Sequence, residues 1–90
     1  MRAKPEQTRS GNDRIARGAV RHRFDRAARV PFLCECDDWR CAELIRLTLP
    51  EYELGRRSGD FLVVAGHAVA GAEPLRDSDG WCVLRRTAAS

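Results

Sequence analysis

The sequence has no long hydrophobic run and no apolar segment of the kind found in secretory signal peptides. Its longest mostly apolar stretch, residues 61–72, is about half the ~20 residues that a membrane-spanning helix needs. His67 and two glycines interrupt that stretch, and the first residues of the chain are polar and charged. We therefore expect a cytoplasmic protein that does not enter a membrane.

The motifs that identify common enzyme classes are also missing. The chain has no glycine-rich nucleotide-binding loop, no nucleophile elbow, no HExxH helix and no zinc-deaminase pattern. With 90 residues, its hydrophobic core is small and supplies only a few kcal/mol of stability. We expect a non-enzymatic protein whose small fold is reinforced by a disulfide or a metal ion.

Positive charge is concentrated in the first third of the chain. Residues 1–30 contain nine Lys or Arg against three Asp or Glu, whereas residues 31–90 contain seven against ten. Such a basic segment suits an acidic protein surface or nucleic-acid phosphates, although a solvated helix face has the same composition. The side chains that would make nucleic-acid contacts are Arg14, Arg17, Arg21 and Arg29.

The basic segment divides into a polar tail and a helix. Residues 1–11 lack periodicity and predict a disordered tail. Asn12 is a plausible N-cap for a helix over residues 12–30, which Pro31 ends because the residue before a proline avoids the helical conformation. Apolar residues recur at helical spacing along this segment. They are Ile15, Ala19, Val20, Phe24, Ala27 and Ala28.

The remaining segments alternate between strand and helix signals. Residues 30–36 and 43–48 predict a hairpin across a cysteine-bearing loop. Thr48 and Glu51 form a capping box for a short helix over residues 49–57, with Leu47 and Tyr52 in the positions of a hydrophobic staple. Residues 60–66 predict a buried strand, and a final hairpin turns at residues 77–80. The pattern is that of a small α+β domain over residues 12–90, with the basic helix at 12–30 and the core at 31–90.

Three of the four cysteines lie within the ten residues FLCECDDWRC, 32–41. In a strand, Cys34 and Cys36 project from the same face with Cα atoms about 7 Å apart. Residues 37–40 are enough for a loop that brings Cys41 close to them. Three thiolates in a cytoplasmic protein favour a metal ion, and a structural zinc site takes four such donors.

Two residues compete for the fourth position. His67 follows Gly66 in a loop after a strand, where the backbone is free to turn the side chain inward. Cys82 lies within a strand, where a free cysteine usually packs as a small hydrophobic residue. His22 lies in the basic helix and is less favoured. We prefer His67, although these considerations leave Cys82 open.

Other uses of the thiols are less consistent with their surroundings. Same-face neighbours along a strand are too far apart for a comfortable disulfide. A reactive thiol needs nearby cations, whereas Glu35, Asp37 and Asp38 adjoin the cysteines and only Arg40 opposes them. Negative neighbours disfavour a free thiolate, and a divalent cation compensates three thiolates directly. A metal-dependent enzyme or a thiol redox sensor remains the second alternative.

Residues 32–67 together resemble a group of short, uncharacterised actinobacterial proteins with the pattern F-x-C-E-C, four residues, C, then L-T-x-x-E-Y-E and later G-H. The resemblance implies a zinc site made by Cys34, Cys36, Cys41 and His67, and it leaves Cys82 outside. Ala65 departs from the pattern, because the group tends to have proline there. The matching residues are Cys34, Glu35, Cys36, Cys41, Ile45, Leu47, Thr48, Glu51, Tyr52, Glu53, Phe61, Gly66 and His67.

The sequence thus predicts a small zinc-stabilised α+β domain that acts as a protein-interaction or regulatory adaptor. A protein partner is the first expectation. Nucleic-acid binding through the arginines of the basic helix is the alternative.

Overall fold

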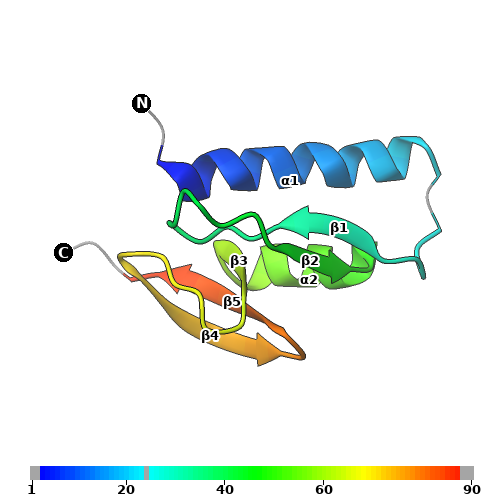
Figure 1. Cartoon of the computed structure of the whole chain (residues 1–90). Helices are drawn as coiled ribbons and strands as arrows, with labels where there is room; N and C mark the ends of the chain where they lie inside the picture. Colours follow the sequence, from blue (N-terminus) through cyan, green and yellow to red (C-terminus); the bar gives the residue numbers. More distant parts are fainter. Residues whose placement is uncertain (1–2, 24, 88–90) are drawn as a thin grey trace.

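The computed structural model describes residues 3–23 and 25–87, and these form an α+β domain as the sequence predicts. Figure 1 shows one long helix lying across a short hairpin, with a second helix and a three-stranded sheet completing the molecule. The elements in chain order are α1 (Lys4–Arg21), β1 (Val30–Leu33), β2 (Leu44–Leu47), α2 (Leu49–Ser58), β3 (Phe61–Val64), β4 (Ala72–Ser78) and β5 (Trp81–Arg86).

The strands form two separate antiparallel sheets. The hairpin of β1 and β2 pairs Val30 with Leu47 and Phe32 with Ile45, so these apolar residues share the buried face. The other sheet has the order β3-β5-β4. Its terminal hairpin turns through Gly80, whose φ of +82° is a left-handed conformation that glycine adopts freely.

The predicted bounds of the first helix are wrong at both ends. α1 begins at Lys4 rather than at Asn12, so residues 4–11 are helical and not a disordered tail. The predicted N-cap, Asn12, is a fully buried residue within the helix. Residues 1–2 of the predicted tail and Phe24 of the predicted helix lie outside the described residues.

Tertiary contacts explain the early start of α1, and local backbone conformation explains its early end. Lys4 is buried, and its ammonium donates a hydrogen bond of 2.9 Å to the carbonyl of Cys34. At the other end, the His22 amide caps the Gly18 carbonyl, and Arg23 follows with a left-handed φ of +54°. The hydrogen bond of Lys4 joins residues that are 30 positions apart in the chain, and a local sequence pattern does not reveal such a contact.

The second helix forms as predicted. The Thr48 hydroxyl accepts a hydrogen bond from the Glu51 amide at 3.3 Å, and the Glu51 carboxylate accepts one from the Thr48 amide at 2.8 Å. These reciprocal bonds are the capping box, and α2 ends at Ser58 with Gly59 as its C-cap. Leu47 and Tyr52, the predicted staple residues, belong to one buried cluster.

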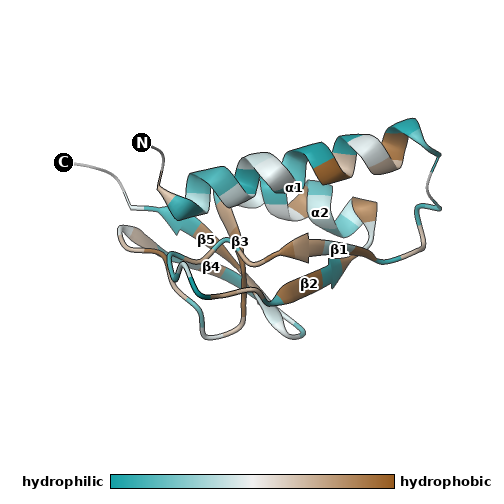
Figure 2. Ribbon diagram, turned by 45° about the horizontal axis from the view of Figure 1, so that its top comes forward, coloured by the Kyte–Doolittle hydropathy of each residue, from teal (hydrophilic) through white to brown (hydrophobic). Residues whose placement is uncertain are grey.

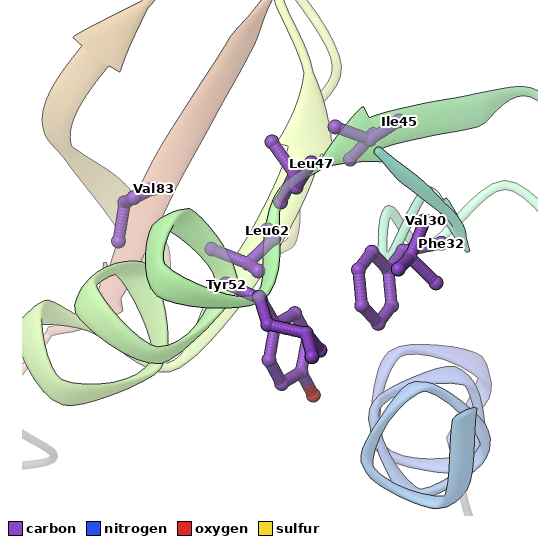
Figure 3. Packing of buried hydrophobic residues seen from close by; sticks show 8 residues of the cluster. Val30, Phe32, Ile45, Leu47, Tyr52, Leu62 and Val83 are labelled. Carbon is purple, nitrogen blue, oxygen red and sulfur yellow. The ribbon is translucent and has the colours of Figure 1, made fainter. Parts of the chain in front are cut away.

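The main core fills the space between the β1–β2 hairpin, the two helices and strands β3 and β5 of the second sheet. Figure 3 shows Val30 and Phe32 pointing from β1 toward the helices, with Tyr52 reaching from α2. The rings of Phe32 and Tyr52 stack with their centroids 4.3 Å apart. A second apolar cluster surrounds Cys34 and Cys36 and contains Phe61, Val63, Val69, Cys82 and Leu84.

The segment after β1 bridges the two sheets, and it corrects the predicted strand over residues 30–36. Pairing with β2 ends near Leu33, although the Cys34 amide still donates to the Glu43 carbonyl at 3.0 Å. The next amide, that of Glu35, donates instead to the Leu62 carbonyl of β3 at 2.9 Å. Cys34 and Cys36 therefore lie where the chain passes from one sheet to the other.

Candidate metal centre

Cys34, Cys36, Cys41 and His67 converge at the junction of the two sheets. One potential ligand atom from each residue lies within 4.8 Å of all the others. The two buried cysteines come from the bridging segment, Cys41 from the loop before β2, and His67 from the turn after β3. The structure thus brings together the four residues that the sequence nominated, and they form a group able to hold a metal ion.

The separations of His67 from two of the thiols match those expected around a shared tetrahedral ion. Zinc–sulfur and zinc–nitrogen bonds of about 2.3 and 2.0–2.1 Å at tetrahedral angles place sulfur and nitrogen about 3.6 Å apart. His67 Nδ1 lies 3.4 Å from Cys34 Sγ and 3.6 Å from Cys41 Sγ. The histidine therefore presents Nδ1, not Nε2, toward the thiols at the separation that shared coordination requires.

Cys82 and His22 are not part of this group. Cys82 lies on β5, paired in register with Val63, and its Sγ is 3.6 Å from the Val83 carbonyl. Burial and the carboxylate of Asp77 raise the pKa of the Cys82 thiol to about 11, so it is a neutral, apolar side chain at physiological pH. His22 is exposed at the end of α1.

A carboxylate and two hydrogen-bond donors surround the candidate ligands. Glu43 lies 2.8 Å from His67 Nε2, an outer-shell contact that fixes the orientation of a metal-binding histidine. The amide of Val64 donates to Cys34 Sγ at 3.2 Å, and the ammonium of Lys4 lies 3.6 Å from Cys36 Sγ. Each of these partners comes from a different element, so the site is supported from several sides.

The buried ammonium of Lys4 adds a positive charge to a site that the sequence surrounds with acidic residues. A divalent ion held by three thiolates and a neutral histidine would carry one net negative charge together with its ligands, and the buried ammonium of Lys4 beside Cys36 would offset that charge. The sequence placed acidic residues around the cysteines, but the Asp37 carboxylate accepts from the Ala70 amide and that of Asp38 from the Arg40 amide. Sequence reasoning missed Lys4 because it assigned residues 1–11 to a disordered tail.

Glu35 lies on the opposite side of the bridging segment from the thiols. Its carboxylate is fully buried and accepts hydrogen bonds from Asn12 Nδ2 at 2.7 Å and from the Leu62 amide at 2.9 Å. The Arg56 guanidinium of α2 binds it through both terminal nitrogens, at 3.0 and 2.6 Å. The alternation of side chains along an extended segment could have revealed that Glu35 faces away from Cys34 and Cys36.

The ion pair of Glu35 and Arg56 extends into a buried network that joins the two helices. Arg56 Nη2 donates to the Tyr52 hydroxyl at 2.8 Å, and that hydroxyl donates to the Asp13 carboxylate of α1. The Asn12 side chain also accepts a hydrogen bond from the Leu33 amide at 2.9 Å and donates one to the Leu33 carbonyl at 2.8 Å. It thereby replaces the backbone of a neighbouring strand. Residues 34–36, the C-E-C triplet, therefore place the candidate metal ligands Cys34 and Cys36 on one side. On the other side they place the Glu35 carboxylate, which contacts both helices.

The thiols differ in acidity when no cation is bound. Burial raises the pKa of Cys34 to about 12. Burial also raises the pKa of Cys36. Hydrogen bonds from the Asp38 backbone and from the His67 and Cys41 side chains outweigh this effect and lower the pKa of Cys36 to about 7. A divalent cation held by these residues would stabilise Cys34 and Cys36 together as thiolates, because metal ligation by cysteine requires the deprotonated form.

Comparison with known proteins adds no assignment. No protein-family model, curated protein or solved structure matches the chain. Among residues 3–23 and 25–87, no helix has the length and apolarity needed to cross a membrane. The actinobacterial family and the cytoplasmic location stay predictions, and the candidate metal centre is argued from its geometry.

Proposed function

We propose that the chain is a non-enzymatic, zinc-stabilised protein-interaction or regulatory adaptor. The convergence of three cysteines and one histidine within 4.8 Å is the observation that carries this proposal. Thiolate and imidazole donors in a tetrahedral arrangement favour zinc over oxygen-preferring ions such as magnesium and calcium. The resemblance to the actinobacterial group supports the same four ligands.

A structural role for the metal follows from the number of donors. Catalytic zinc sites have three protein ligands and keep one position for water or substrate. Ligation by Cys34, Cys36, Cys41 and His67 together would occupy all four positions of a tetrahedral ion and leave none for a reacting group. Zinc at this point would cross-link the two sheets, which is a large contribution in a chain of 90 residues.

Native mass spectrometry of three purified proteins tests the ligand set. We expect wild type and Cys82→Ala each to carry one zinc ion, because Cys82 lies on β5 outside the quartet. His67→Ala is expected to lose the ion or to bind it far more weakly. Loss of zinc from Cys82→Ala, with retention in His67→Ala, would contradict the proposed ligands.

Nucleic-acid binding is a second candidate, supported by the exposed arginines of α1. Arg14, Arg17 and Arg21 are exposed, whereas Arg29 bonds the Arg46 carbonyl at 3.1 Å and lies 3.8 Å from a Glu51 carboxylate oxygen. Phosphate binding by these side chains would give an affinity that falls steeply with salt. An affinity for mixed-sequence oligonucleotides that does not depend on salt, or no affinity, would reject this candidate.

A further inference from the structure

A groove of about 850 Å³ runs between α1 and α2, away from the candidate metal centre. We propose that this groove binds an acidic, amphipathic helical segment of a partner protein. The inference rests on the proposed function, since it assigns the surface and the partner chemistry of the adaptor. Figure 2 shows α1 and α2 beside each other along this part of the molecule.

The floor of the groove is apolar, and among the described residues that line it Val20 of α1 is left largely exposed. Ala16 and Val20 of α1 face Leu49 and Tyr52 of α2 across it. Val20 is one of the apolar residues that recur at helical spacing in the sequence, and it is 58 % exposed in the structure. An exposed apolar side chain beside an apolar groove between two helices suits the apolar face of a further helix.

The rim of the groove carries unpaired positive charge. Arg17, Arg21 and Arg57 line it, and none of them has a carboxylate within 4.0 Å in the part of the chain that the structure describes. The acidic residue of the lining, Glu53, already lies 3.6 Å from Arg26. Three free guanidinium groups around an apolar floor are complementary to a helix with an apolar face flanked by carboxylates.

The apolar floor distinguishes this occupant from nucleic acid. Phosphates need the arginines alone, and they gain nothing from burial against Val20 and Leu49. A protein helix uses both features, because its leucine or phenylalanine anchors fill the groove while its carboxylates meet the rim. The fixed position of Arg56, which binds Glu35 at 2.6 Å beneath the rim, holds α2 in place for such a contact.

Titration of the zinc-loaded full chain with designed peptides tests the proposal. The probes are amphipathic helical peptides with leucines at i, i+3, i+4 and i+7 and glutamates at the flanking positions, and a matched set with lysines in place of the glutamates. We expect the acidic set to bind and to shift the amide NMR signals of Ala16, Val20, Leu49 and Arg57. The lysine set is expected not to bind.

Three variants separate the apolar and charged contributions. Val20→Ser removes an exposed apolar contact at constant charge, and Arg17→Glu reverses one rim charge; each is expected to weaken the acidic peptides by about tenfold or more. Arg46→Glu makes the same charge change on the exposed face of β2, away from the helices, and is expected to leave binding within about twofold. Zinc content measured on each sample keeps failure of the groove separate from failure of the metal proposal.

Several results would overturn the groove proposal. A zinc-loaded, folded chain that binds neither peptide set would do so while leaving the zinc-stabilised module intact. If Arg17→Glu and Arg46→Glu weaken the binding of the acidic peptides equally, the binding reflects general charge attraction and not contact with the groove. Binding of mixed-sequence oligonucleotides that Arg17→Glu weakens and Val20→Ser does not would assign the arginines to nucleic acid instead.

Discussion

Replacement of Cys41 by serine is expected to remove the metal and with it most of the stability of the domain. Cys41 is the least buried of the three thiols, so its replacement by serine costs little packing and the effect reports on metal binding. Zinc-finger peptides gain about 10–16 kcal/mol of apparent free energy on binding zinc, and a loss of several kcal/mol is expected here. Thermal unfolding followed by circular dichroism measures it.

Cys82→Ala is the matched control for this experiment. It also removes one thiol, from a buried position of the second apolar cluster, and it is expected to cost only the packing of a small side chain. A Cys41→Ser protein that unfolds at the same temperature as wild type, with Cys82→Ala the less stable of the two, would contradict a structural role for the quartet.

Replacement of Arg56 by methionine is expected to destabilise the fold by about 3–5 kcal/mol. The reason is that the fully buried carboxylate of Glu35 would lose its main counter-ion. The free energy of unfolding in urea measures the loss. Arg57→Met, at the exposed neighbouring position on α2, is expected to change it by less than about 0.5 kcal/mol.

A double variant separates the loss of charge compensation from the loss of packing. Adding Glu35→Gln to Arg56→Met removes the uncompensated charge, so the double variant is expected to be more stable than Arg56→Met alone. If the two substitutions add without recovery, the bidentate ion pair is not what makes Arg56 important.

The sequence predicts the grouping of the four candidate metal ligands better than it predicts the first helix, for a physical reason. Three cysteines close together are constrained by their chemistry, and the turn after β3 brings His67 to them. The capping box of α2 is likewise a local signal, since Thr48 and Glu51 are three residues apart. Such local or chemically specific patterns are visible in a single chain.

The buried polar contacts are different, because each partner comes from a distant part of the chain. The local sequence predicts that Asn12 is an N-cap. In the structure it lies within α1, and its side-chain amide hydrogen-bonds to the Leu33 backbone and the Glu35 carboxylate. Lys4 lies in a polar, arginine-rich segment, and only the folded structure places its ammonium 3.6 Å from Cys36 Sγ. Tertiary contacts of this kind override local composition and set where α1 begins.

The C-E-C triplet, residues 34–36, connects the candidate metal centre to the two helices. Cys34 and Cys36 face the candidate metal, while Glu35 between them holds Asn12 of α1 and Arg56 of α2. An ion that fixes the cysteines therefore also fixes the carboxylate on which both helices depend. The groove between α1 and α2 would share this dependence.

The thermal unfolding of purified, metal-analysed protein with and without a strong zinc chelator tests the central claim most directly. We predict one zinc ion per chain, a cooperative transition when it is bound, and a transition that is lost or shifted far downward by the chelator and restored by added zinc. Metal-free protein that unfolds cooperatively at the same temperature with and without chelator would contradict the account.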